Sequence, residues 1–189
     1  MPPRVEIFVF FGLIASGKST LAAAWAKEIG AAHYNSDVVR KELAGLLPQS
    51  AQRAEFQGGI YTPELSRRTY ETLLAKASRE IAAGRSVVLD ASYHSAALRG
   101  QVRELAAQSG CPLLFVQCLC PEDEMKKRME IRARDPKAVS DGRWEIYLKQ
   151  KVNFGQPDEL GQAELLAITT DKPVDLLVKQ LATMVMERR

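Results

Sequence analysis

A glycine-rich segment close to the N-terminus combines residue types that bind phosphate at the spacing that phosphate binding needs. Gly12, Gly17, Lys18 and Ser19 match the pattern G-x-x-x-x-G-K-[ST], between a predicted strand and a predicted helix. Glycines let successive backbone N–H groups turn toward an anion, and the helix that starts here points its positive end at it. Lys18 would carry a charge to the β- and γ-phosphates, and the Ser19 hydroxyl would bind Mg²⁺. The segment therefore predicts nucleoside triphosphate binding through Gly12, Ala15, Ser16, Gly17, Lys18, Ser19 and Thr20.

A carboxylate stands at the end of a second apolar run, Val87–Asp90. Ligands of open α/β sheets gather at the carboxyl ends of the strands, so Asp90 is placed to support Mg²⁺, most simply through a bound water. A turn or helix-capping role is the alternative interpretation of this aspartate. Ala91 follows where motor-type ATPases place a glutamate to activate water, and the guanine-reading motifs of GTPases fit poorly. The pattern therefore favours transfer of phosphate to a bound acceptor over transfer to water.

Asp37 and Arg40 follow a predicted short strand at the same edge of the sheet. Transfer to a hydroxyl needs a group that takes its proton, and a carboxylate at this edge is such a group. Arg40 is one helical turn further on, so it would hold the acceptor or its phosphate. The alternative is an N-cap aspartate followed by a surface arginine, because Asp37 stands where a helix cap would stand. One aspartate can serve both purposes.

Two arginines, Arg128 and Arg132, are four residues apart and share one face of a predicted helix. Guanidinium groups stack on adenine and bind phosphate oxygens through paired hydrogen bonds, so these arginines are candidate contacts for a nucleotide. A solvated basic helix face is the alternative. Two long polar segments that contain proline and glycine, 46–60 and 133–143, are candidate lids because loops of that length are usually functional.

Short apolar runs alternate with longer segments of helical periodicity, which is the pattern of a parallel α/β sheet covered by helices. Gly30, Gly84 and Gly110 end three of the helical segments, and Thr62 with Pro63 begins another. These elements predict one doubly wound α/β domain over residues 1–189. Its five strands are expected at Val5–Phe11, Ala32–Asn35, Ser86–Ala91, Pro112–Leu119 and Ala163–Thr169.

The composition excludes several classes of protein. Hydrophobic residues make up 46% of the 189 residues and charged residues 26%, which is typical of a globular chain and argues against disorder. No stretch of the sequence is apolar enough to span a membrane, and three cysteines without a secretory signal suit a reducing cytoplasm. The net charge of +3 suits an anionic ligand, and it neither requires nor excludes a nucleic-acid acceptor. We expect a cytoplasmic protein that is monomeric by default and has no membrane partner.

Four segments together resemble one family of phosphate-loop kinases: GLIASGKST, NSDVVRKELAG, GRSVVLDAS and KKRMEIRARD. From Val5 to about Phe154 the chain is similar to AAA_33-type kinases. These include polynucleotide 5′-kinase domains, zeta-toxin-like kinases and kinase-like domains fused to aminoglycoside phosphotransferase-like proteins. The resemblance implies a three-layer, nucleoside-monophosphate-kinase-like P-loop fold with a lid and the strand order 2-3-1-4-5. It also implies ATP and Mg²⁺ as cofactors and an alcohol group as the acceptor.

The same resemblance implies roles for individual residues. Asp37 matches the base of polynucleotide kinases, and Arg40 matches the arginine three residues after it. Arg128 and Arg132 match an R-x-x-x-R motif that holds adenine and phosphate in related kinases. Arg99 corresponds to an arginine that contacts the acceptor. The residues expected to be catalytic are Lys18, Asp37 and Arg132.

The expected function is transfer of the γ-phosphate of ATP to a hydroxyl of a small-molecule or nucleic-acid acceptor. Two alternatives stay open. A polynucleotide 5′-kinase would have a basic groove wide enough for a strand and would bind it in a salt-dependent way. A non-catalytic regulatory module would bind ATP and transfer nothing, and the presence of Asp37, Asp90 and Arg132 argues against it. We recognise neither the additional acceptor-binding residues of polynucleotide kinases nor those of zeta toxins, which leaves the acceptor open.

Overall fold

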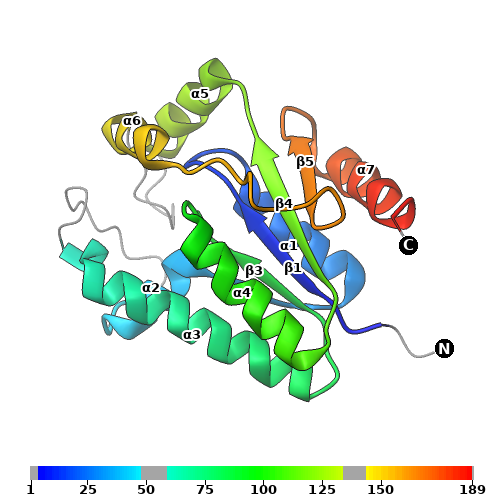
Figure 1. Ribbon diagram of the computed structural model, residues 1–189. Coiled ribbons are helices and arrows are strands. Elements are labelled where there is room, and N and C mark those ends of the chain that lie inside the picture. Colours follow the sequence, from blue (N-terminus) through cyan, green and yellow to red (C-terminus); the bar gives the residue numbers. More distant parts are fainter. Residues whose placement is uncertain (1–3, 48–58, 134–143, 189) are drawn as a thin grey trace.

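The computed structural model describes residues 4–47, 59–133 and 144–188 of the chain (Figure 1). At its centre is a five-stranded parallel sheet with the strand order β2-β3-β1-β4-β5, which confirms the predicted topology. The strands are β1 Ile7–Phe11, β2 Ala32–Asn35, β3 Val87–Asp90, β4 Leu113–Leu119 and β5 Leu165–Thr169.

The central strand, β1, is buried along its whole length. It pairs with β3 on one side and β4 on the other, and a strand covered on both faces forms one continuous apolar run. The register places Phe10 of β1 opposite Asp90 of β3, and Asp90 opposite Asn35 of β2. The carboxyl ends of these three strands therefore meet at one edge of the sheet, where ligands of such folds bind.

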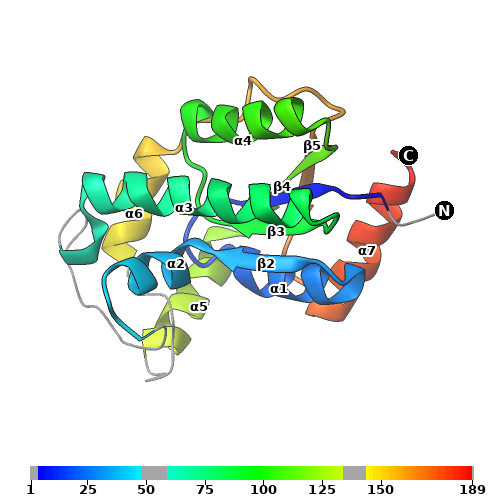
Figure 2. The ribbon, with the colours of Figure 1, turned by 90° about the horizontal axis from the view of Figure 1, so that it is seen from below.

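Helices form a layer on each face of the sheet (Figure 2). α3 and α4 pack on one face through a core that includes Leu73 and Val102, and α1 and α7 pack on the other through Trp25 and Leu181. This confirms the expected three-layer arrangement. No helix of the described residues is both long enough and apolar enough to cross a bilayer. The helices are α1 Lys18–Ile29, α2 Ser36–Leu43, α3 Pro63–Ala82, α4 Ala96–Ser109, α5 Glu122–Ala133, α6 Trp144–Asn153 and α7 Val174–Met186, with a short 3₁₀ helix, η1, at Gly59–Tyr61.

The sequence pattern does not predict α6, because its apolar residues do not form one buried stripe. Tyr147 is buried, whereas Leu148 and Val152 are exposed. α6 packs against α5 near the carboxyl end of the sheet (Figure 1). There the Tyr147 hydroxyl and the Lys151 ammonium both donate to Glu122. Both predicted lids lie largely outside the described residues, which leave out 48–58 and 134–143.

Candidate active site

The glycine-rich loop between β1 and α1 has the backbone shape that its sequence predicts. Gly12 and Gly17 have φ values of 146° and 81°, in the region that favours glycine. A Cβ at Gly12 would lie 2.6 Å from the carbonyl oxygen of Cys118, and one at Gly17 would lie 2.9 Å from Nη1 of Arg128. Conformation and close approach to the backbone both require glycine at Gly12, whereas Gly17 is required by its conformation. α1 begins directly after the loop, so the positive end of its dipole faces the loop.

Two side chains of the loop are arranged to meet an anion. The Lys18 ammonium donates to the backbone carbonyl of Leu13 at 3.3 Å, and no carboxylate of the described chain lies within ion-pair distance of it. Ser16 Oγ is buried and has no hydrogen-bond partner among the described residues. Buried polar groups normally have a partner, so the Ser16 hydroxyl suits a phosphate bound in the loop. The Lys18 ammonium suits one because no carboxylate in the described ranges neutralises its charge.

Thr170, directly after β5, holds the loop from the side of the sheet. Its hydroxyl lies 2.5 Å from the carbonyl oxygen of Ser16 and 3.1 Å from that of Leu119, and the residue is buried. No sequence motif indicates this role, because the contact joins positions 154 residues apart.

Asn35, the last residue of β2, connects three parts of the site and was also not predicted. Its Nδ2 donates to Oδ2 of Asp90 at 2.5 Å and to the Ser19 hydroxyl at 3.3 Å. Its Oδ1 accepts from two backbone N–H groups in the first turn of α2, at 2.9 and 3.1 Å. Asn35 is therefore the N-cap of α2. The alternative interpretation of Asp37 as that cap is wrong, because α2 begins before it.

Ser19 and Asp90 supply oxygen atoms of the kind that Mg²⁺ prefers. Asp90 is fully buried, and in the described part of the chain its Oδ1 has no hydrogen-bond partner. Its other oxygen is held by Asn35 and lies 3.6 Å from Nε2 of His33. A buried carboxylate oxygen without a partner is unfavourable, so a metal-bound water fits there. The described residues contain no cluster of three or more His, Cys, Asp or Glu side chains that could hold a metal ion.

Asp37 lies in the first turn of α2 and is half-buried. Burial raises the pKa of its carboxyl above the ordinary value of 3.8, and the negative charge of Asp90 adds to this rise. The positive charges of Lys18 and Arg40 oppose it. These electrostatic interactions show that the structure brings the carboxylate, the loop lysine and Asp90 to one end of the sheet.

Arg40 is only 6% exposed, so it is not the surface arginine of the alternative interpretation. Its Nη1 donates to the hydroxyl of Ser66 on α3 at 2.9 Å, and its guanidinium carbon lies 5.0 Å from the centre of the Tyr61 ring. Its Nε is buried without a hydrogen-bond partner among the described residues. A buried cation with a free donor is suited to hold a polar or anionic group of a ligand.

A chain of hydrogen bonds that the sequence did not predict lies near Arg40. The Tyr70 hydroxyl is 3.0 Å from Oγ of Ser92, and that oxygen is 3.3 Å from Nδ1 of His94. Burial raises the pKa of Tyr70, while its bond to Ser92 and the charge of Arg40 oppose the rise. These residues come together because the segment after β3 lies beside α3. No local sequence pattern predicts this contact.

Arg128 packs against the glycine-rich loop. On α5, its Nε donates to Glu124 at 3.1 Å and its Nη2 donates to the carbonyl oxygen of Thr170 at 2.5 Å. The side chain is 24% exposed, so the alternative interpretation of Arg128 as part of a solvated basic helix face does not fit. Arg132 lies in the same helix with its side chain outside the described part of the structure, and its role stays a prediction.

The acceptor role expected for Arg99 does not fit its surroundings. The residue has no exposed surface. Its Nε and Nη2 donate to the carboxylate of Glu159 at 2.5 and 3.0 Å, and this bonding holds the pKa of Glu159 below its ordinary value. Its Nη groups also donate to the backbone carbonyls of Tyr93, Gly155 and Gln156. These bonds use all the donors of the guanidinium within the protein, so Arg99 links parts of the fold instead of contacting an acceptor.

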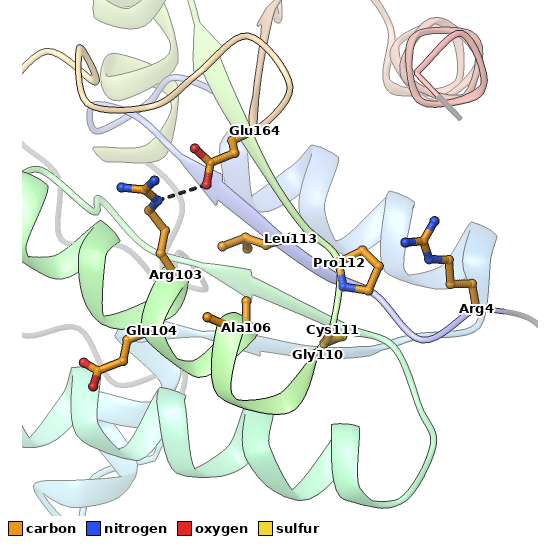
Figure 3. Close-up of a pocket in the computed structure, with 10 residues that line it drawn as sticks. Arg4, Arg103, Glu104, Ala106, Gly110, Cys111, Pro112, Leu113 and Glu164 are labelled. Carbon is orange, nitrogen blue, oxygen red and sulfur yellow. Dashed lines mark hydrogen bonds and ion pairs between the residues drawn. The ribbon is translucent and has the colours of Figure 1, made fainter.

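An open pocket of about 680 Å³ lies at the amino end of β4, away from the glycine-rich loop (Figure 3). The end of α4 and the start of β4 line it, together with the ion pair between Arg103 and Glu164 at 2.9 Å. It contains none of the predicted site residues. Because ligands of these sheets bind at the carboxyl ends of the strands, we do not assign this pocket to the site.

The strand order and the glycine-rich loop define a P-loop protein with a kinase-like fold. Comparison with known proteins then narrows the class. The model of the AAA_33 family, described as an AAA domain, matches residues 7–157, and the chain belongs to this family.

Curated relatives match part of the chain. Uncharacterised proteins of Mycobacterium tuberculosis and Mycobacterium bovis are 29% identical over 129 residues, which cover 68% of this chain. The match covers 26% of those proteins, so the chain spans about a quarter of the length of the curated relatives it matches.

Several solved kinases have the same fold. A sugar kinase from Janibacter has a TM-score of 0.67 at 20% identity, and the match covers 96% of this chain and 94% of that chain. The APS kinase of Mycobacterium tuberculosis, solved with AMPPNP and APS, has a TM-score of 0.68 at 19% identity and coverages of 98% and 99%. A gluconokinase from Sinorhizobium meliloti has a TM-score of 0.62 at 21% identity, with coverages of 98% and 97%. At these identities the similarity shows a shared fold.

Proposed function

We propose that this protein is an ATP-dependent kinase that transfers the γ-phosphate of ATP to a hydroxyl group of a small-molecule acceptor. The observation that carries the proposal is the position of Asp37, a half-buried carboxylate with a raised pKa in electrostatic contact with Lys18. Phosphoryl transfer to an alcohol needs such a base beside the phosphate site. Transfer to water would need a second carboxylate after Asp90, where the chain has Ala91.

In the proposed step, the acceptor oxygen forms a bond to the γ-phosphorus, the bond from that phosphorus to the bridging oxygen breaks, and ADP leaves. Asp37 takes the proton of the acceptor hydroxyl, and its raised pKa makes it a stronger base than an exposed aspartate. Lys18 stabilises the negative charge on the transferring phosphate. Arg40 holds the acceptor through the donor that has no partner within the described chain.

Ser19 and Asp90 would hold Mg²⁺, with Asp90 acting through a water. When bound, the ion would neutralise part of the negative charge of the nucleotide phosphates. Asn35 keeps Ser19 and Asp90 at a fixed separation because its amide donates to both. The same side chain caps the helix that carries Asp37, so one residue aligns the metal-binding and proton-accepting groups.

Two observations favour a small acceptor over a polynucleotide. The net charge of +3 is modest for a protein that binds a nucleic-acid strand. The acceptor side of the proposed site is formed by two buried residues, Arg40 and Tyr70, with side-chain partners on neighbouring elements. The solved proteins named as a sugar kinase and a gluconokinase show that this fold serves small acceptors elsewhere.

The test is transfer of phosphate from labelled ATP to a panel of sugars, sugar acids, nucleosides, aminoglycosides and oligonucleotides. We expect at least one small-molecule product, and we expect Lys18→Ala to abolish its formation because this ammonium faces the transferring phosphate. Lys27→Ala is the matched control, since Lys27 is exposed on α1. Transfer only to oligonucleotides would replace the proposal with a polynucleotide kinase, and ATP binding without transfer to any acceptor would favour a regulatory module.

A further inference from the structure

A side chain of α6 contacts the glycine-rich loop at a position that no motif predicts. Oε1 of Gln150 accepts a hydrogen bond from the backbone N–H of Ile14 at 3.0 Å. A backbone N–H can only donate, so this bond requires that the oxygen of the amide, and not its nitrogen, faces the loop. The two residues are 136 positions apart, so the contact exists only in the folded chain.

Gln150 reaches the loop from a helix that is also anchored to α5. The Tyr147 hydroxyl and the Lys151 ammonium donate to Glu122 of α5 at 2.9 and 2.6 Å. Both residues are on α6, on either side of Gln150 in the sequence, and Gln150 itself is half-buried. The amide therefore has a defined position before any ligand is bound.

The loop needs a directional contact at this point. Ala15 has a φ of 60°, which residues with a Cβ rarely adopt. Ile14 and Ala15 also pack with Met125, Met129 and Tyr147, but apolar contacts have no preferred direction. A hydrogen bond to the N–H of Ile14 orients the peptide plane between Leu13 and Ile14, which is one residue before the peptide that joins Ile14 to Ala15. It therefore helps to aim the N–H groups that follow, which are the ones predicted to surround the phosphates.

We propose that Gln150 is a positioning residue of the nucleotide site, and that its Oε1 holds the loop in its phosphate-binding shape before the nucleotide arrives. The proposal rests on the proposed binding of nucleotide by this loop. A loop that is ordered in advance loses less conformational entropy on binding, so its affinity is higher. Without the acceptor, the Ile14 N–H loses its side-chain partner, and its peptide plane is held only through the Leu13 carbonyl, which accepts from the Ser16 N–H and the Lys18 ammonium.

The first test compares two substitutions of the same kind. Gln150→Met removes the acceptor with little change in size, and Gln101→Met makes the same change at an exposed position of α4. By calorimetric titration with ADP and Mg²⁺, we expect Gln150→Met to bind about tenfold more weakly, the scale expected when one buried group loses its partner. Gln101→Met should bind like the unchanged protein. A Gln150→Met protein that binds ADP within about twofold of the unchanged protein overturns the proposal.

The second test measures how well the contact protects the Ile14 N–H from exchange in the absence of nucleotide. Gln150→Glu keeps an acceptor oxygen, so amide hydrogen exchange at Ile14 should stay slow in this variant and in the unchanged protein. In Gln150→Met it should be at least about tenfold faster. Equal exchange rates in all three proteins overturn the proposal. If the unchanged protein binds no nucleotide, the proposed function fails, whereas the exchange rates still decide whether Gln150 orients the loop.

Discussion

At the scale of single residues, two opposing influences act on the pKa of Asp37. Lys18 and Arg40 favour its ionised form, yet burial and Asp90 outweigh them, and the pKa of the carboxyl is raised. A raised pKa makes a carboxylate a better proton acceptor, but the folded protein then loses stability when the group ionises. Function and stability therefore make opposite demands on this residue. Both demands can be measured.

Asp37→Asn keeps the shape of the side chain and removes the proton acceptor. We expect phosphate transfer to fall by roughly 10²–10⁴-fold, the usual scale for loss of a general base, with ATP affinity almost unchanged. The helix cap survives because Asn35 provides it. Asp123→Asn, at an exposed position on α5, is the matched control. Steady-state kinetics with an identified acceptor make the comparison, and an active Asp37→Asn protein would remove this residue from the mechanism.

The raised pKa also predicts the sign of a stability change. At a pH between the ordinary value of 3.8 and the higher folded pKa, the folded chain holds a proton that the unfolded chain has lost. The free energy of unfolding therefore falls as the pH rises through this interval, and the loss is complete above the folded pKa. At about pH 7, Asp37→Asn should melt at a higher temperature than the unchanged protein, and the difference should shrink toward about pH 4. Thermal melts across this range check the sign, and a lower melting temperature at neutral pH would contradict it.

At the scale of elements, the junction of β2 and α2 aligns the site through Asn35. Asn35→Ala removes a helix cap, which should lower the free energy of unfolding by about 1 kcal/mol. It also removes the shared donor of Asp90 and Ser19, so half-maximal transfer should need more Mg²⁺. Ser95→Ala removes only a cap, that of α4, where Ser95 accepts from the N–H of Leu98. Asn35→Ala should lose more stability than Ser95→Ala, because it also leaves an oxygen of the buried Asp90 without its donor. Only Asn35→Ala should shift the Mg²⁺ titration, and identical titrations would exclude the alignment role.

At the scale of the whole molecule, Arg99 joins α4 to the segment between α6 and β5. Arg99→Met breaks a buried ion pair and leaves backbone carbonyls without donors, so we expect a loss of about 3–5 kcal/mol in urea unfolding. Arg103, on the same helix as Arg99, forms an ion pair with Glu164 that is more exposed than the pair of Arg99 with Glu159. Arg103→Met should therefore lower the free energy of unfolding by less than about 1 kcal/mol. The KM for the acceptor should be the same in both variants. A raised KM in Arg99→Met with unchanged stability would restore the acceptor role.

The sequence by itself determined the glycine-rich loop and most of the elements, because these depend on patterns within a few residues. The spacing of Gly12, Gly17 and Lys18 predicted the loop, and the apolar run before it predicted the central strand. Thr62 begins a helix as its N-cap, and Gly30 ends one in the left-handed conformation. The carboxylate at the end of β3 was also placed correctly, since parallel strands end at one edge of the sheet.

Only the tertiary structure decided how the site is held together. Asn35 bonds to Asp90 across 55 positions, Gln150 to the loop across 136, and Thr170 to the loop across 154. The burial of Arg99 by Glu159 depends on a contact across 60 positions, which is why its expected acceptor role fails. Such contacts are set by strand register and by the packing of crossover helices, and these leave no periodic signal in the sequence around either partner. Local patterns place a residue at an edge of the sheet, and only the packing of distant segments decides which atoms of that residue remain free to bind a ligand.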